Sequence, residues 1–316
     1  MTCTASVIVA TRNRSALLAQ TLEALLRQTW PASRFEVVVA DNGSTDGTRA
    51  VVDRAAAAGE PAIRYLAVPT PGKSHAVNAA LAIARGETLA FTDDDVRPDA
   101  RWLARLIEAL GRPGIDFVAG RMLPIWETPP PSWMSSALYG VLAVPDNGEV
   151  PTPINTPDGD VMPIGANMAV RRAVVERVGG LRVDLGKLEG TLRTGEDHEF
   201  FLRMIHAGFR GVYEPGAIAH HWVPAERLER RYFRRWLYQN GRDVARLEVS
   251  YPVAARRLLG IPRYRLRQGG DDVLAFVRSI AGGDRARRVA ASPRLHWDAG
   301  YFRESWLATS APFRAS

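Results

Sequence analysis

Residues 88–95 read TLAFTDDD, a short apolar run that ends in three aspartates. Apolar runs of roughly four to eight residues are typical of strands. Comparable runs lie elsewhere in the first half of the chain, and stretches with helical periodicity separate them. The runs cover residues 6–11, 35–40, 63–68 and 117–121, and the helical stretches cover about 15–28, 45–58, 74–84 and 100–110. This alternation predicts βαβ units, and hence an α/β fold with a mostly parallel central sheet flanked by helices.

The chain changes character after residue 123. Residues 124–163 are rich in proline and have little periodicity, which predicts a long functional loop. Regular patterns then return as a helix from Arg172, a second helix from about 194 to 207, and a strand-like run at 217–219. Beyond residue 222 the pattern is mostly helical. We therefore expect three parts, with boundaries after residues 123 and 222.

The composition limits the class of protein. With 316 residues, of which 46% are hydrophobic, the chain can bury one large core. Its only cysteine, Cys3, excludes an internal disulfide and a cysteine-rich metal site. A single cysteine fits a reducing compartment, so we expect a cytoplasmic location. No stretch approaches the roughly 18 apolar residues that a membrane-spanning helix requires.

The charge of the chain favours an anionic partner. The net charge is +7 and the isoelectric point is near 10.0, which would suit a nucleotide, a nucleic acid or an anionic lipid surface. Arginines are densest at 227–246 and 256–288. No aromatic platform or helix-turn-helix pattern accompanies them, so we expect no nucleic-acid partner.

The three aspartates end a predicted strand, at the edge where open α/β sheets bind ligands. Adjacent buried carboxylates require compensating charge. In an extended segment Asp93 and Asp95 would project to one side and Asp94 to the other. The outer pair could then bind Mg²⁺ or Mn²⁺, which prefer oxygen ligands. The alternative is a solvated loop that caps the next helix near Asp99.

Polar residues near the first strands are candidates for binding a nucleotide. Asp41 can accept hydrogen bonds from a base or a ribose, and Thr11, Arg12 and Asn13 close the first strand beside it. Asp41 could instead form a local turn. Lys73 lies at a helix N-terminus, where backbone donors favour phosphate, although the spacing of a P-loop is absent.

Two later segments add candidate catalytic and metal-binding groups. Glu196 and Asp197 open an amphipathic helix, where a carboxylate could accept the proton of an attacking hydroxyl or could simply cap the helix. His220 and His221 follow the strand-like run. One of them, for which we favour His221, could complete the ligand set of the metal. The alternative is a packed or surface histidine pair.

Taken together and in this order, these segments resemble the family 2 glycosyltransferases, enzymes with the GT-A fold and its Rossmann-like sheet. The resemblance covers roughly the first 240 residues and rests on several ordered motifs. These read SVIVATRNR at 6–14, VVADNGSTDGT at 38–48, GKS at 72–74 followed by Asn78, and FTDDD at 91–95. The later GAN at 165–167 and GED at 195–197 look like the family's acceptor-side and catalytic-base segments.

The resemblance implies an inverting, metal-dependent transfer of a sugar from a UDP, GDP or dTDP sugar to an acceptor hydroxyl. Asp41 would bind the nucleobase, Asp93 the ribose or the metal, and Asp95 the metal, while Asp197 would act as the base. The other donor-side or acceptor-side candidates are Thr11, Arg12, Asn13, Lys73, Asp94, Asn167 and Glu196. The three parts then become a nucleotide-sugar-binding half (1–123), an acceptor-binding half (124–222) and a helical extension (223–316).

The acceptor remains open to three chemical classes: a saccharide, a lipid-linked sugar or a small natural product. The family's processive polysaccharide synthases carry a Gln-x-x-Arg-Trp motif and membrane spans, and neither occurs here. Transfer of a single sugar, in the synthesis of a cell-envelope glycan or another polysaccharide, is therefore expected.

The first C-terminal helix, predicted between residues 224 and 249, combines an apolar stripe with surrounding arginines. The stripe consists of Leu228, Tyr232, Phe233, Trp236 and Leu237. We expect it to dock on the catalytic domain. The alternative is peripheral contact with the inner face of the plasma membrane, where the helix would meet a lipid-linked acceptor.

Two other functions fit parts of the sequence. A phosphotransferase of the haloacid dehalogenase type also has Asp-x-Asp after a strand, but it would carry Thr or Val where Arg97 stands. A catalytically inactive sugar-nucleotide-binding protein would keep the donor site without turnover. Asp197 distinguishes this second alternative from an enzyme.

Overall fold

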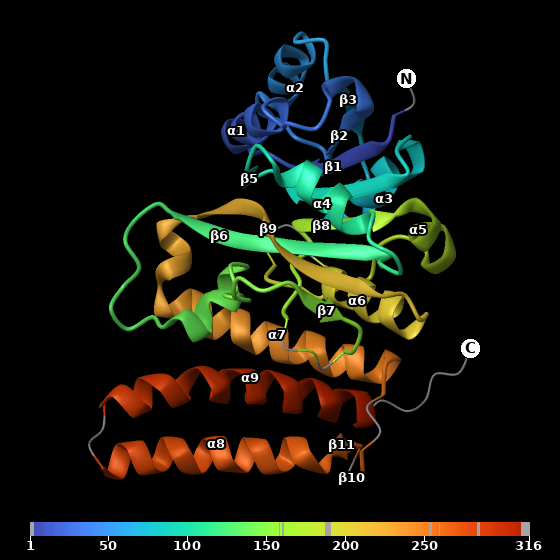
Figure 1. Cartoon of the computed structure of the whole chain (residues 1–316). Helices are drawn as coiled ribbons and strands as arrows, with labels where there is room; N and C mark the ends of the chain where they lie inside the picture. Colours follow the sequence, from blue (N-terminus) through green and yellow to red (C-terminus); the bar gives the residue numbers. More distant parts are fainter. Residues whose placement is uncertain are drawn as a thin grey trace. The chain divides into compact units, whose positions relative to one another are not determined.

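The computed structural model describes residues 3–157, 159, 161–186, 191–252, 255–258, 260–282 and 285–310, without the side chains of 285–291 and 308–310. Contacts divide the chain into two compact units, coloured by sequence in Figure 1. The first contains Met1–Thr128, Ser135–Glu189 and Glu196–Val223. The second contains Pro129–Met134, Gly190–Gly195 and Pro224–Ser316. Two short internal segments thus belong to the second unit, a grouping that the sequence did not predict.

The first unit begins with four parallel strands in the order β3-β2-β1-β4. Their bounds are β1 (Ala5–Thr11), β2 (Phe35–Asp41), β3 (Ala62–Ala67) and β4 (Thr88–Asp93). They are connected by α1 (Ser15–Leu26), α2 (Thr48–Ala56) and α3 (Lys73–Ile83). Each helix lies within a few residues of its predicted range. In α1, Leu18, Leu22 and Leu25 are buried at helical spacing, which fixes the face that packs on the sheet.

The second half of the sheet is mixed. Short strands pair antiparallel with their neighbours, β8 with β4 and β6, and β5 and β7 with β9, whereas β6 and β9 run parallel. Their bounds are β5 (Val96–Pro98), β6 (Phe117–Trp126), β7 (Thr152–Ile154), β8 (Asn167–Arg171) and β9 (Gly211–Val223). The α/β class is confirmed, but only β1 to β4 form a wholly parallel block, because the remaining strands combine the parallel β6–β9 pair with antiparallel pairs. Strands connected without a crossover helix can pair antiparallel.

The proline-rich stretch contains more regular structure than expected. β6 continues to Trp126, and a 3₁₀ helix, η2 (Ser136–Leu142), and β7 lie within residues 124–163. Similarly, β9 begins at Gly211, six residues before the predicted strand. The reason is that partner strands stabilise extended backbone even where proline or glycine obscures the alternation.

Helices cover the sheet around an aromatic core. These are α4 (Trp102–Leu110), α5 (Arg172–Val178) and α6 (Glu196–His206). Phe200 and Phe201 of α6 are buried, and the ring of Phe201 lies 5.8 Å from that of Phe117 in β6. Because α6 opens with Glu196 and Asp197, this packing also fixes where two candidate site residues lie.

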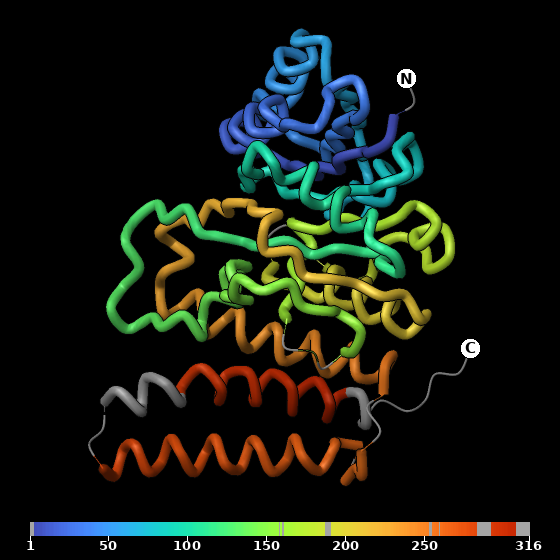
Figure 2. Tube along the Cα trace, viewed as in Figure 1, coloured from blue at the N-terminus to red at the C-terminus, as the bar shows by residue number. Residues whose placement is uncertain are grey.

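The second unit is built from α7 (Arg230–Ser250), α8 (Arg263–Ala281) and α9 (Arg285–Ser310), with a small hairpin of β10 (Arg257–Leu258) and β11 (Ile261–Pro262). Within this unit α9 lies between α7 and α8 (Figure 2). Tyr301 of α9 donates a hydrogen bond to Glu248 of α7 at 2.6 Å, and Arg265 of α8 lies 3.0 Å from the same carboxylate. This buried polar cluster joins the three helices.

The apolar stripe of the first C-terminal helix is covered. Leu228 and Phe233 are buried, Tyr232, Trp236 and Leu237 are half-buried, and Phe233 packs edge-on against Trp133 within the second unit. The stripe is therefore largely covered, and both docking on the catalytic domain and membrane contact of this helix stay predictions. Among the described residues no helix is both long and apolar enough to cross a bilayer.

Close packing of α7 on α9 leads to the first prediction. A methyl group at Gly241 would overlap the carbonyl oxygen of Trp297, and one at Gly300 would overlap that of Tyr238. Either glycine-to-alanine change should therefore lower the free energy of unfolding by about 1–3 kcal/mol. Gly270 in α8 has open space around it, so Gly270→Ala should raise stability by about 0.5–1 kcal/mol. Urea denaturation measures the free energy of unfolding of each variant. Similar changes at Gly241, Gly300 and Gly270 would contradict the close packing of α7 on α9.

Candidate functional site

Three neighbouring strands end with polar side chains at the same edge of the sheet. β1, β2 and β4 run parallel, with Thr11 opposite Asp41 and Ala10 opposite Asp93. Their carboxyl ends therefore bring Thr11, Asp41 and Asp93 together, as the sequence predicted. This is the edge at which open α/β sheets bind ligands.

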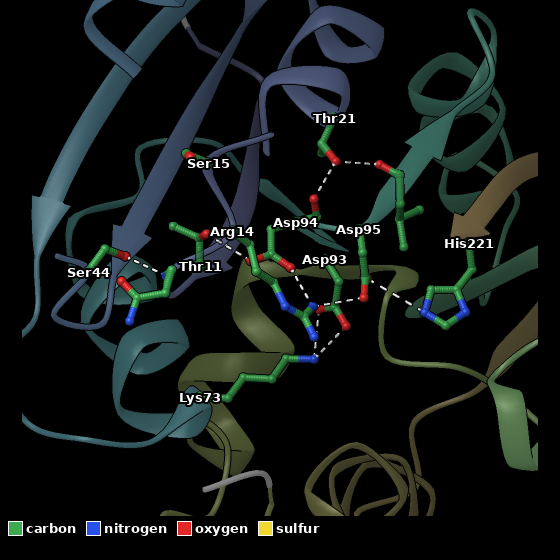
Figure 3. A network of polar contacts seen from close by, with 12 residues as sticks. Thr11, Arg14, Ser15, Thr21, Ser44, Lys73, Asp93, Asp94, Asp95 and His221 are labelled. Atoms are coloured by element: carbon green, nitrogen blue, oxygen red, sulfur yellow. Dashed lines mark hydrogen bonds and ion pairs between the residues drawn. The ribbon is translucent and has the colours of Figure 1, made fainter. Parts of the chain in front are cut away.

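Asp94 is held from several sides by the protein (Figure 3). The hydroxyl of Thr11 donates to its carboxylate at 2.8 Å, and Arg14 bonds it at 3.0 Å. Thr21 lies 2.9 Å from its backbone carbonyl. Burial and then the charge of Asp95 raise the pKa of Asp94 to about 6, although Arg14 and Thr11 oppose the shift. With both carboxylate oxygens bonded, Asp94 supports the turn after β4.

Asp95 faces Arg14 and His221. One carboxylate oxygen lies 2.8 Å from the Arg14 guanidinium, and the other lies 3.6 Å from Nε2 of His221 (Figure 3). Nδ1 of His221 lies 2.9 Å from the carbonyl of Leu142, to which it donates when it carries the proton. Histidine ligands of metals usually donate their second ring nitrogen in this way. The contact therefore orients Nε2 towards Asp95.

Asp93 points towards a different partner. Its carboxylate bonds Nζ of Lys73 at 2.7 Å, and both residues line a small cavity together with Thr92, Gly165, Glu196 and Asp197. Burial would lower the pKa of Lys73, but the charges of Asp93, Glu196 and Asp197 raise it. Lys73 was expected to favour phosphate directly. In the structure its ammonium bonds the carboxylate of Asp93, and the phosphate contact stays a prediction.

Glu196 is a buried residue that lines the same cavity. Burial and then the charge of Asp197 raise its pKa to about 7, while Lys73 lowers it. The hydroxyl of Thr92, which lines the same cavity, is buried and has no hydrogen-bond partner among the described residues. A bound polar group would satisfy this hydroxyl, because buried polar atoms are rarely left unpaired.

Asp197 lies half-buried in the first turn of α6, with its carboxylate held by two backbone donors. The amide of Gly165 donates to one oxygen at 3.1 Å, and the amide of His198 donates to the other at 2.9 Å. A Cβ at position 165 would lie 2.6 Å from Cβ of Asp197, so the glycine allows this close approach. The arrangement leaves lone pairs on both oxygens for a further hydrogen bond.

Asp41 and the residues after β1 form the other side of the edge. Tyr65 donates to one oxygen of Asp41 at 2.8 Å, and the amide of Ser44 donates to the other at 2.9 Å. The Ser44 bond is the local turn that was the alternative for Asp41. Asn13 bonds the amide of Thr45 at 2.7 Å and so joins the loops after β1 and β2. Arg12 lies half-buried beside it.

Asn167 lies within the fold and not at the site surface. Its side chain is fully buried, accepts from Trp102 at 2.7 Å, and donates to the carbonyls of Arg121 and Ala217 at 2.9 and 3.0 Å. Both amide hydrogens are used. Asn167 thus holds β8, α4 and β9 together, and its expected role in ligand binding stays a prediction.

The described residues contain no group of three or more His, Cys, Asp or Glu side chains arranged to hold a metal ion. The expected trio is separated because Asp93 bonds Lys73, while Asp95 and His221 form a pair. Two protein ligands are nevertheless enough for Mg²⁺ or Mn²⁺ beside a nucleotide, since such ions take their remaining ligands from phosphates and water. The residues present therefore fit a metal that is bound jointly by protein and donor.

Two residues that contact the site were missed among the sequence candidates. Arg14 bonds Asp94 and Asp95, and Tyr65 bonds Asp41. Arg14 belongs to the motif at 6–14, so its position was a usable signal. No sequence signal marked Tyr65, because a single tyrosine in a predicted strand is compatible with many roles.

The segment that leads into α6 is anchored by α7. The amide of Thr194 donates to the buried carboxylate of Asp243 at 3.0 Å, and Gln239 and Arg246 bond the other oxygen. Gly195, with φ of +105°, follows in the left-handed region that favours glycine. Thr194 and Asp243 both belong to the second unit. After Gly195 the chain continues directly into Glu196 and Asp197.

Comparison with known proteins identifies the family. The model of the family "Glycosyl transferase family 2" matches residues 6–179, more than half of the chain. The chain therefore belongs to glycosyltransferase family 2, and it is a glycosyltransferase. This assignment replaces the haloacid dehalogenase and inactive-binder alternatives.

Among relatives, the succinoglycan biosynthesis protein ExoM of Rhizobium meliloti is 30% identical over 282 residues, 88% of this chain and 86% of ExoM. Glycosyltransferase AglE of Haloferax volcanii is 32% identical over 117 residues, 37% of this chain and 38% of AglE. The pre-mycofactocin glycosyltransferase of Mycobacterium tuberculosis is 30% identical over 184 residues, 57% of this chain and 36% of that protein. The ExoM match thus spans most of both chains, whereas the other two cover parts.

Solved structures share the fold at low identity. The mannosyltransferase PcManGT of Pyrobaculum calidifontis, in complex with GDP-Man and Mn²⁺, has a TM-score of 0.66 and 22% identity, covering 96% of this chain and 87% of that one. TarS 1-349 of S. aureus in complex with UDP has a TM-score of 0.52 and 17% identity, covering 95% and 91%. These likenesses support the GT-A fold.

The anchoring of residues 191–195 leads to the second prediction. Asp243→Ala removes the acceptor of the Thr194 amide, so the chain before α6 should lose its fixed position. Because small displacements of catalytic groups are costly, we expect kcat to fall about ten- to hundredfold with little change in the KM of the donor. Asp243→Asn keeps an acceptor oxygen and should restore part of kcat.

Gln239→Ala is the matched control, because it removes a partner of Asp243 but leaves the Thr194 bond intact. Steady-state kinetics and thermal unfolding of all three variants distinguish an effect on kcat from an effect on stability. A loss of stability in Asp243→Ala with an unchanged kcat would show that the contact serves folding alone.

Proposed function

We propose that this chain is an inverting, metal-dependent enzyme that transfers a single sugar from a nucleoside diphosphate sugar to an acceptor hydroxyl. The observation that carries the proposal is the position of Asp197. Its carboxylate is oriented by the amides of Gly165 and His198 beside a cavity that Asp93 and Lys73 also line. One base beside the donor edge of the sheet suits a single displacement.

On the donor side, the proposal gives each polar group one task. Asp41 accepts hydrogen bonds from the nucleobase, Thr11, Arg12 and Asn13 border it, and Asp93 binds the ribose or shares in metal binding. Asp95 and His221 would hold Mg²⁺ or Mn²⁺, which, when bound, would offset charge on the leaving diphosphate. GDP-Man with Mn²⁺ in PcManGT and UDP in TarS support a nucleotide donor of this class.

On the acceptor side, the chain's own residues move one proton. Asp197 accepts the proton of the acceptor hydroxyl while that oxygen forms its bond to the anomeric carbon. The bond from this carbon to the diphosphate breaks, and its electron pair leaves with the diphosphate. Attack opposite the leaving group inverts the configuration. Lys73, held on Asp93, keeps positive charge beside these carboxylates.

For the acceptor, the relation to ExoM favours a growing saccharide chain, including one carried on a lipid. We place the reaction in the cytoplasm, where a lone free cysteine such as Cys3 stays reduced. Residues 124–163, with η2 next to His221 through Leu142, are the segment proposed to select the acceptor.

The third prediction tests the base. Asp197→Asn keeps the size of the side chain and an acceptor oxygen but removes the basic carboxylate. We expect kcat for sugar transfer to fall about 10²- to 10⁴-fold while the affinity for the nucleotide changes little. Glu108→Gln, a change at an exposed carboxylate on α4, is the control and should leave both values unchanged. If Asp197→Asn transferred sugar at the wild-type rate, another residue would have to be the base.

The fourth prediction tests the donor and the metal. UDP, GDP and dTDP sugars are screened by thermal unfolding with Mn²⁺ or with EDTA. A donor at one hundred times its Kd should stabilise the protein by about 2.7 kcal/mol, a rise in Tm on the order of 4 °C, only when metal is present. Asp95→Asn and His221→Ala should abolish the part that depends on metal. Equal stabilisation in EDTA would contradict metal dependence.

A further inference from the structure

An exposed apolar surface lies on α8, outside the site and outside the helix for which membrane contact was the alternative to docking. Four large side chains form it, which we call the α8 face. They are Val273, Leu274, Val277 and Ile280, exposed by 53%, 45%, 52% and 51%. Residues three and four apart lie on one side of a helix, so these four form one continuous patch.

Another side of α8 packs within the second unit. Gly269 lies against the ring of Phe302 in α9, Ser279 is buried, and Asp272 meets Arg294 of α9 at 3.4 Å. Since α9 lies between α8 and most of α7 within this unit, α8 is an outer helix there (Figures 1 and 2). The α8 face is therefore the side of an outer helix that its own unit does not cover.

The charge of the second unit is strongly positive. Residues 224–316 contain nineteen arginines and nine acidic residues, whereas the whole chain has 41 basic and 34 acidic residues. The positive excess of the protein therefore lies entirely in this part, and the preceding residues are slightly acidic. Every basic residue in this part is arginine, which suits phosphate groups because its planar fork binds two oxygens at once.

Arginines also border the α8 face itself. Arg278 is one turn beyond Leu274, and Arg267 and Arg263 lie about two and three turns before it, towards the start of the helix. α8 also carries two carboxylates. Asp272 is engaged with Arg294, and Asp271 lies 4.0 Å from Arg267, a distance at which an exposed ion pair is weak. The rim of the face is therefore net basic.

From this combination we infer that the α8 face binds the surface of an anionic phospholipid bilayer. Helices that lie in a membrane interface combine an apolar side with arginines or lysines that reach the lipid phosphates. A second copy of the chain is the poorer occupant, because two basic rims would repel each other. The inference goes beyond the proposed transfer reaction and does not depend on it.

The test uses the full chain and flotation with two kinds of vesicle, phosphatidylcholine alone and equal parts of phosphatidylcholine and phosphatidylglycerol. We expect binding to the anionic vesicles at low salt and its loss at high salt, because exposed charges are screened. The double changes Leu274→Glu with Val277→Glu, and Arg267→Glu with Arg278→Glu, should each weaken binding at least about tenfold. Val249→Glu, at a valine on α7 that is 70% exposed, is the control and should bind like the wild type.

Three outcomes would overturn the inference. The first is no flotation of the wild type with anionic vesicles. The second is equal flotation of the α8 variants and the control. The third is a dimer in solution that the Leu274→Glu, Val277→Glu variant dissociates, without vesicle binding, which would make the face an interface between copies. Donor hydrolysis measured on the same samples keeps a failure of this inference distinct from a failure of the transfer reaction.

Discussion

The site depends on compensating the charge of buried carboxylates at the edge of the sheet. Asp94 and Asp95 are almost fully buried, and Arg14 bonds both. Removing one partner from a buried ion pair typically costs about 3–5 kcal/mol, because the remaining charge stays desolvated. The loop after β1 must therefore bring Arg14 onto the residues after β4. Lys73 compensates the charge of Asp93 in the same way. The positions of Arg14 and Lys73 therefore determine how the carboxylates are arranged at this edge of the sheet.

The same constraint separates the roles of three consecutive residues. Asp94 is saturated by Thr11 and Arg14, Asp95 keeps one oxygen towards His221, and Asp93 turns to Lys73 and the cavity beside Asp197. Identical side chains thus acquire different chemistry from their neighbours alone. Arg14 bonds both Asp94 and Asp95. It thereby links the loop after β1 to the residues that follow β4.

The sequence predicted those parts in which one local pattern determines the structure. Strands β1 to β4, helices α1 and α3 and the position of the acidic triplet followed from apolar runs and motif spacing. β5, β7 and β8 have three to five residues each and were missed, because they are stabilised by partners distant in the chain. For the same reason, neither the Lys73–Asp93 bond nor the enclosure of Asn167 could be predicted, since each depends on how separate loops meet.

One structural feature bears on how such enzymes diverge. The order of the chain and the division into units do not coincide, because Pro129–Met134 and Gly190–Gly195 belong with the helices after residue 223. A chimera that joined this catalytic unit to the C-terminal helices of a relative at residue 223 would leave Thr194 facing a foreign partner in place of Asp243. The two inner segments and the helices would have to be exchanged together. Recombination at a single point is therefore a poor route to new variants of this protein, and paired substitutions within the second unit, in segments distant in the chain, are the expected one.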